Sequence, residues 1–231
     1  MKNKSIILIA ILVILLVLAS LTTTEKKETK KGEEDKLWIE YNVEGNETNL
    51  DQYETKNPVV ALYIEKYGSV VIELYPKIAP NTVNNFISLV KDGFYDNNTF
   101  HRLVPGFVLQ GGDPTGTGTG GPGYTIKGEF AANDFENNLR HKKGIVSMAR
   151  SSDYDSAGSQ FFIMLATAAH LDDEYAAFGK VIDGWDNIKN IVDNEKVADE
   201  ASGQLKNNLV LKKALIDLKD NDIKEVKKIT D

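Results

Sequence analysis

Residues 100–113, FHRLVPGFVLQGGD, carry the pattern that decides the fold of this chain. Large apolar residues alternate with other residues on both sides of Pro105-Gly106, a pair that is typical of a turn. The stretch therefore predicts a β-hairpin. Arg102 lies inside the first run, where an arginine must either extend to solvent or point at a partner. Spacing alone favours a solvated strand face.

The rest of the chain predicts more strands and two helices. One helix is expected from Pro80 to about Gly93, because apolar residues recur there at i, i+3, i+4 and i+7. A second is expected around Trp185. Many short strands with two separated helices predict an antiparallel barrel. The β-rich runs lie at residues 59–65, 70–75, 144–149, 160–165, 178–181 and 209–218.

Composition excludes several classes of function. The 231 residues suit one domain with appendages. The chain has no cysteine, which excludes disulfides, zinc-thiolate sites and cysteine nucleophiles. Its net charge is −7 without a basic cluster, so we expect no nucleic-acid partner. The three histidines, His101, His141 and His170, have no metal-ligand spacing, so we expect no metal and no cofactor.

Residues 1–21 predict a membrane anchor or a signal segment. Lys2 and Lys4 precede an apolar run from Ile6 to Leu21, whose length fits either a signal peptide or a short membrane span. No clear cleavage site follows, so we favour an uncleaved anchor in the cell membrane with the following domain outside. Cleavage would instead give a secreted protein.

Two segments flank the predicted domain. Residues 22–56 are expected to form a polar tether, because residues 22–36 are charged and almost free of large apolar side chains. Residues 37–43 alternate and hint at a short strand, and what residues 37–56 contact stays open. Residues 219–231 form a charged C-terminal tail that we expect to be peripheral.

A glycine-rich stretch follows the hairpin. Gly116, Gly118 and Gly121 formally satisfy the GxGxxG pattern of nucleotide-binding loops. Strand-type residues follow Gly123, so no helix N-terminus could receive a phosphate. We therefore expect a long surface loop near a binding groove.

The string at residues 100–113 resembles the signature of the cyclophilin family of peptidyl-prolyl cis/trans isomerases, FHR-x-x-PGF-x-x-QGGD. Two further blocks are similar to the family's other active-site segment and to the segment that closes its pocket: SMARSSDYDSAGSQFFI at 147–163 and HLDDEYAAFGKVIDG at 170–184. The resemblance implies an isomerase domain at residues 57–218 of a bacterial-like, exported or membrane-anchored member. It also implies a mainly β fold, a closed eight-stranded antiparallel β-barrel capped by two α-helices.

The implied reaction is rotation about an X-Pro peptide bond, whose barrier of about 18–20 kcal/mol reflects the amide resonance that must be broken. No bond is made or cut, so the reaction needs no nucleophile, metal or proton shuttle. A hydrogen-bond donor directed at the prolyl nitrogen stabilises the twisted amide, because its lone pair is released when resonance is lost. By resemblance, Arg102 is this catalytic donor, and its guanidinium stays charged.

The resemblance also implies the substrate-binding residues. Gln110 and Gln160 would orient the arginine and the peptide, while the main chain at Ala149 and Arg150 would hold the residue before proline. Without the motif, surface amides would explain the glutamines, and core packing would explain the apolar residues. An apolar pocket would hold the proline ring, with an expected lining of Phe107, Val108, Phe162, Leu171 and Tyr175.

Four positions depart from frequent family residues. Val108 stands where many members have methionine, Arg150 where many eukaryotic members have asparagine, and Tyr175 where histidine is frequent. His170 aligns with the tryptophan typical of the members most sensitive to cyclosporin. We therefore expect His170 to be a residue of the pocket rim, with catalysis retained and weak cyclosporin binding.

Two functions compete. The first is a monomeric peptidyl-prolyl isomerase that binds proline-containing polypeptides and assists the folding of unfolded or exported chains outside the cytoplasmic membrane. The alternative is a proline-peptide binding module or adaptor with little turnover. The presence of Arg102 with both glutamines favours the enzyme. A hydrolase has less support, because the sequence has no nucleophile-elbow motif.

Overall fold

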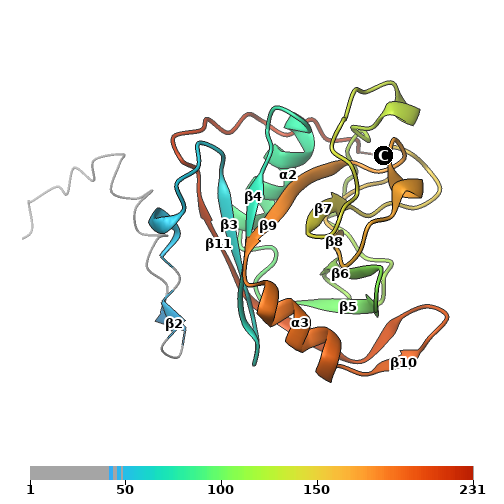
Figure 1. Cartoon of the computed structure of the whole chain (residues 1–231). Coiled ribbons are helices and arrows are strands. Elements are labelled where there is room, and N and C mark those ends of the chain that lie inside the picture. The colour runs from blue at the N-terminus through green and yellow to red at the C-terminus, as the bar shows by residue number, and fades with distance from the viewer. Residues whose placement is uncertain (1–41, 44–45, 48, 231) are drawn as a thin grey trace, which may run out of the picture. The chain divides into compact units, whose positions relative to one another are not determined.

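The computed structural model of this chain describes residues 42–43, 46–47 and 49–230 (Figure 1). The predicted anchor at residues 1–21 and most of the predicted tether at residues 22–56 lie outside the described residues. Within the described ranges, no helix is long and apolar enough to cross a membrane.

Eight antiparallel strands form a closed barrel, which confirms the predicted fold. Their order is β11-β3-β4-β9-β7-β8-β6-β5, and β5 pairs with β11 to complete the ring. The barrel strands are β3 (Val59–Ile64), β4 (Gly68–Leu74), β5 (Asn98–Val104), β6 (Val108–Asp113), β7 (Ile145–Met148), β8 (Phe161–Met164), β9 (Ala177–Asp183) and β11 (Gln204–Asp217).

Closure depends on the length of β11. This strand has 14 residues, pairs with β3 through Leu211–Asp217 and pairs with β5 through its earlier residues. The prediction of a strand at residues 209–218 missed its first part, and it also missed β10 (Val197–Asp199), which pairs with that part. Outside the barrel, β1 (Asn42–Val43) pairs with β2 (Asn46–Glu47).

The hairpin predicted at residues 100–113 is confirmed as β5 and β6. Its turn lies at Pro105-Gly106, and its register pairs Arg102 with Gln110. The arginine and the first glutamine of the motif therefore lie side by side on the same face of the sheet.

Both predicted helices are confirmed, as α2 (Pro80–Lys91) and α3 (Trp185–Asn194). In the view of Figure 1, α2 lies near the top of the barrel and α3 near the bottom. The apolar stripe of α2 is buried in the barrel core. Its N-terminus receives the carboxylate of Glu129, which accepts the N–H groups of Asn81 (3.0 Å) and Thr82 (2.8 Å). The described residues also form the short 3-10 helices η2 (Leu50–Gln52), η3 (Ala131–Asn133) and η4 (Ala169–Leu171).

The barrel interior is filled with side chains, as expected for eight strands. Aromatic rings occupy its centre, where Phe86 of α2 meets Phe161 edge-to-face at 5.2 Å and Phe178 at 5.1 Å. A ligand site must therefore lie on the outside of the barrel.

Both flanking segments pack on the domain in their described parts. Leu50 is fully buried against the outside of β3 and β4, and Tyr53 donates its hydroxyl to Asp183 (2.5 Å). The packed part of the chain therefore begins before residue 57, the boundary drawn from the sequence. Residues 219–230, here called the C-terminal segment, pack along α2, and Ile223 and Val226 contact the barrel core.

Candidate active site

Arg102 projects from the middle of β5 and is held from two sides. Its Nε donates to the carbonyl of Ser202 (2.7 Å), and its Nη1 donates to Oε1 of Gln110 (3.1 Å). The side chain is half-buried, and this burial lowers the pKa of the guanidinium, while the nearby Tyr175 opposes the shift. Arginine nevertheless stays protonated near neutral pH. Two fixed hydrogen bonds aim the remaining N–H groups of Arg102 along the outer face of the sheet.

The two predicted glutamines form a chain of amides that begins at the arginine. Gln110 donates from Nε2 to Oε1 of Gln160 (3.1 Å). Gln160 then donates to the carbonyls of Gly118 (3.0 Å) and Gly120 (2.9 Å) in the glycine-rich loop. Because each amide accepts on one side and donates on the other, the orientation of both is fixed. The structure therefore links Arg102 to the loop that the GxGxxG pattern marked.

The expected pocket residues form an apolar cluster separate from the barrel core. Successive residues of a strand point to opposite faces, so Val108 and Phe162 lie outside while Leu109 and Phe161 lie inside. Core packing in the barrel is therefore not the role of the two outward residues. The outer cluster contains Val108, Phe162, Leu171, Met164 and Ala168 among its buried members, with Phe107, Ala149 and Tyr175 packed at its edge.

Aromatic contacts shape the edge of this cluster. His170, the expected rim residue, stacks on Phe107 with ring centroids 5.8 Å apart. On the other side, Tyr175 meets Phe162 edge-to-face at 5.9 Å. The two pairs leave apolar surface between them that suits a proline ring.

A serine, a histidine and an aspartate lie in line beneath Phe162, an arrangement that sequence reasoning missed. His141 contacts Asp172 through Nδ1 (3.0 Å) and Ser147 through Nε2 (3.0 Å), and its ring stacks under Phe162 at 6.2 Å. Burial lowers the pKa of His141, against the opposing effect of Asp172. Because Ser147 and His141 are almost completely buried, a substrate cannot reach this set. It instead ties β7 to the 3-10 helix η4 that carries His170. His141 and Asp172 lie 31 residues apart in the sequence, so no local pattern could have indicated that they pair.

The Arg150 side chain has a role beyond the backbone contact expected for it. Its guanidinium lies 4.5 Å from the ring centroid of Tyr175 and 4.8 Å from that of Tyr154. Its Nε donates to the carbonyl of Glu174 (3.0 Å). Next to it, the Ala149 N–H donates to the carbonyl of Gln160 (2.9 Å). Through these contacts, Arg150 holds the loop after β7 close to Tyr175 at the edge of the pocket cluster.

The turn that holds Arg102 was also missed. Ser202 lies in the turn between β10 and β11, 100 residues from Arg102. Gly203 lets this turn approach β5: its φ is +75°, and a Cβ there would lie 2.5 Å from Val104 Cγ2 and 2.9 Å from the Leu103 carbonyl oxygen. A small turn residue could have been noted from the sequence, but its partner could not.

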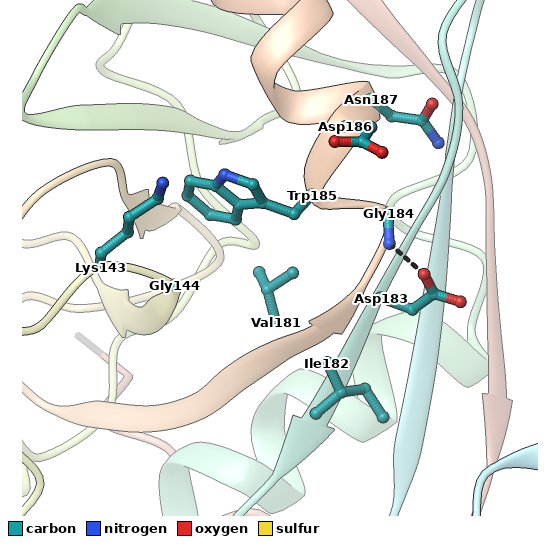
Figure 2. Close-up of a pocket in the computed structure, with 9 residues that line it drawn as sticks. All are labelled: Lys143, Gly144, Val181, Ile182, Asp183, Gly184, Trp185, Asp186 and Asn187. Carbon is teal, nitrogen blue, oxygen red and sulfur yellow. Dashed lines mark hydrogen bonds between the residues drawn. The ribbon is translucent and has the colours of Figure 1, made fainter.

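Among the described residues, one cavity lies beside the expected site residues and another lies apart from them. A cavity of about 430 Å³ is bordered by the two site glutamines, by Ala149 and Arg150, and by the glycine-rich loop. The second, of about 630 Å³, lies at the start of α3, where the Lys143 ammonium sits 4.2 Å from the ring centroid of Trp185 (Figure 2). None of the expected site residues lines the second cavity. Among the described residues, no group of acidic and histidine side chains is placed to hold a metal.

Comparisons with known proteins agree with this geometry. Residues 59–214 match the family described as cyclophilin type peptidyl-prolyl cis-trans isomerase/CLD. The chain is 49% identical over 128 residues to peptidyl-prolyl cis-trans isomerase B of Bacillus subtilis, covering 55% of this chain and 86% of the relative. It is 49% identical over 114 residues to a peptidyl-prolyl cis-trans isomerase of Helicobacter pylori, covering 49% and 67%. A crystal structure of a Cryptosporidium parvum cyclophilin type isomerase, in the presence of the dipeptide Ala-Pro, superposes with a TM-score of 0.61 at 34% identity, covering 69% of this chain and 98% of that one.

Proposed function

Because this chain belongs to the cyclophilin-type peptidyl-prolyl cis-trans isomerase family, we propose that the outer face around Arg102 accelerates cis/trans rotation of X-Pro bonds in polypeptides. The observation that carries the proposal is the double anchoring of Arg102 beside an apolar pocket. A charged donor and an apolar surface next to each other are what a twisted prolyl amide requires.

Rotation about the X-Pro bond is accelerated when the site stabilises the twisted amide more than the planar one. Amide resonance withdraws the lone pair of the prolyl nitrogen in the planar ground state, and twisting returns it. An N–H of Arg102 then donates to this nitrogen, while the proline ring rests against Phe162 and the neighbouring apolar residues. Since Ser202 and Gln110 already hold the guanidinium, it need not reorganise when the amide twists.

The expected contribution of this hydrogen bond is limited. A hydrogen bond to a charged group contributes about 1.5–3 kcal/mol, or roughly ten- to a hundredfold in rate. The apolar pocket supplies the rest by removing water from the amide and holding the ring. We assign the peptide backbone to Gln160 and to the main chain at Ala149 and Arg150.

The direct test is the cis-to-trans rate of an Ala-Pro peptide with the full chain and with Arg102→Ala. We expect kcat/KM to fall by about ten- to a hundredfold, because the donor is lost. Arg102→Lys should not restore it, because one ammonium cannot replace the guanidinium fork held by Ser202 and Gln110. The control is Lys189→Ala, which removes a positive charge from an exposed ion pair with Asp193 on α3.

The alternative is a binding module with little turnover. That function would be supported if the folded, unmodified chain bound proline peptides without accelerating their isomerisation. Retention of full activity in Arg102→Ala would show instead that another group supplies the donor.

We also propose that this isomerase acts outside the cytoplasmic membrane on unfolded or newly exported chains, as a monomer whose domain at residues 57–218 also carries Leu50, Tyr53 and the C-terminal segment packed on its surface. The support is the apolar run of residues 6–21 after Lys2 and Lys4. Fractionation of cells, followed by protease treatment of intact and opened cells, tests the placement. Protection of the domain in intact, wall-stripped cells would contradict it, and a shortened soluble product would indicate cleavage.

We propose that the domain binds cyclosporin weakly, because of the residue at the pocket rim, His170. His170 stacks on Phe107 where sensitive members have tryptophan, and an indole offers more apolar surface than an imidazole. We expect His170→Trp to bind cyclosporin more tightly in a calorimetric titration while turnover of Ala-Pro peptides stays near that of the unmodified chain. The proposal is wrong if the unmodified chain binds the drug as tightly as tryptophan-bearing members do.

A further inference from the structure

The C-terminal segment lies beyond residues 59–214 that match the family, yet it is bound to the domain by main-chain contacts. The N–H of Lys227 donates to Oδ1 of Asn81 (2.9 Å), and Nδ2 of the same asparagine donates back to the Lys227 carbonyl (3.0 Å). The N–H of Lys224 donates to Oδ1 of Asn84 (3.3 Å). Two asparagines of α2 therefore hold the segment in an extended path along the helix.

The end of this path reaches a loop next to the active site. Thr125 and Ile229 form an antiparallel bridge: Ile229 N–H donates to the Thr125 carbonyl (2.8 Å), and Thr125 N–H donates to the Ile229 carbonyl (3.0 Å). The ammonium of Lys228 lies 4.2 Å from the ring centroid of Tyr124. The segment thus pairs with this loop through a single isolated β-bridge.

Tyr124 and Thr125 line the 430 Å³ cavity that also borders Gln110 and Gln160. A third asparagine of α2, Asn85, accepts the Tyr124 hydroxyl (2.7 Å) and donates to the carbonyl of Gly158, another residue that lines the cavity (2.8 Å). Asn85 of α2 therefore braces two residues that line the cavity, and the C-terminal segment pairs with the same wall at Thr125.

A peptide bound at the pocket would extend into this cavity. The cavity and the pocket share Ala149 as a border, and the two site glutamines lie at their junction. A residue that flanks the proline in an extended peptide would therefore lie in the cavity that Tyr124 and Thr125 line.

We propose that the C-terminal segment is a positioning element for substrate binding, in which Lys228 and the main chain of Ile229 hold the Tyr124–Thr125 wall that receives a residue flanking the proline. The inference rests on the proposed function and adds a determinant of affinity for longer peptides. Lys228 and Ile229 act through the wall and do not contact the reacting amide.

The test compares the dipeptide Ala-Pro with hexapeptides that carry Ala-Pro at their centre, using the full chain. Ile229→Pro removes the N–H that donates to Thr125, and its matched control Ile229→Ala keeps that N–H while removing an exposed side chain. Lys228→Ala removes the cation over Tyr124, and Lys228→Arg keeps one. Isomerisation is followed by NMR exchange, and affinity is measured separately by calorimetric titration.

For Ile229→Pro and Lys228→Ala, we expect KM and Kd for the hexapeptides to rise about three- to tenfold, the scale of one lost hydrogen bond, with kcat unchanged. The dipeptide should show no change, and both control variants should resemble the unmodified chain. Equal hexapeptide affinity in Ile229→Pro and the unmodified chain would overturn the inference, as would an equal loss in Ile229→Ala. Lack of turnover by the unmodified chain would overturn the proposed function instead, and the affinity comparison would still decide the role of the segment.

Discussion

The two faces of strands β6 and β8 have opposite tasks. Phe161 points into the barrel, is fully buried and contacts the central aromatic cluster. Its neighbour Phe162 points outward into the pocket cluster, where half-buried side chains border it. The same strands therefore contribute to the barrel core on one face and to the proposed substrate pocket on the other. A strand can do both because its side chains alternate with a period of two.

The polar groups follow the same division. The interior cluster is built from apolar and aromatic side chains, whereas the outer face has Arg102, the two glutamines and the buried His141 set. Buried polar groups are costly unless they are hydrogen-bonded, so their concentration beneath the pocket indicates that positioning is the task there. Substitutions on the inner face should consequently reduce mainly the free energy of unfolding, whereas substitutions on the outer face should reduce mainly kcat/KM.

The largest expected difference is between Phe161→Ala and Phe162→Ala. Phe161→Ala leaves a cavity in a closed interior and should lower the free energy of unfolding by about 3–5 kcal/mol. Phe162→Ala should lower it by about 2–3 kcal/mol, because Phe162 is also buried but lies in the smaller outer cluster, and it should reduce kcat/KM by about tenfold or more. Urea denaturation and the isomerisation rate of the folded fraction measure the two effects.

The comparison would fail if both variants lost stability equally, or if Phe161→Ala lost activity in its folded fraction while Phe162→Ala did not. Leu109 and Val108 offer a second inward and outward pair on β6 that should repeat the result.

A smaller effect is expected at Asp113, which organises the glycine-rich loop at the end of β6. Its carboxylate accepts the N–H groups of Thr115 (2.7 Å) and Thr117 (3.1 Å). Burial alone would raise the pKa of Asp113, but hydrogen bonds from Thr115, Gly120 and Gly118 outweigh it and lower the pKa from 3.8 to about 2. A lowered pKa in the folded state stabilises the protein above pH about 4, and this stabilisation is lost as the pH falls through about 2.

The Asp113→Asn variant tests this dependence. At neutral pH we expect it to be less stable by about 2 kcal/mol, the value of a shift of nearly two pKa units. The difference between the two proteins should shrink between pH 4 and pH 2 when denaturation is measured at each pH. A difference that stayed constant with pH would show that the lost contacts, and not the ionised carboxylate, account for the effect.

The smallest expected effect is at Gln160, whose amide connects the arginine chain to the loop. Gln160→Ala removes its hydrogen bonds to Gly118 and Gly120 and should lower kcat/KM about three- to tenfold, with little change in thermal stability. Gln52→Ala, at an exposed position of η2, is the matched control. Unchanged turnover in Gln160→Ala would separate the loop from the catalytic arginine.

The sequence by itself determined the local elements and the identity of the motif residues. The hairpin at residues 100–113 and the apolar stripe of α2 follow from periodicity and turn residues, which act over a few positions. The motif also selected Arg102 and both glutamines, and the structure brings these three side chains into one hydrogen-bonded chain.

Tertiary structure alone decided the contacts between distant segments. Closure of the barrel through β11 and β5, the Ser202 carbonyl on Arg102, the pairing of His141 with Asp172 and the path of the C-terminal segment over α2 all join residues far apart in the chain. Local periodicity cannot encode these contacts, because it states which face of an element is apolar and not which distant element will cover it. The anchoring of Arg102 and the wall of its neighbouring cavity are of this second kind.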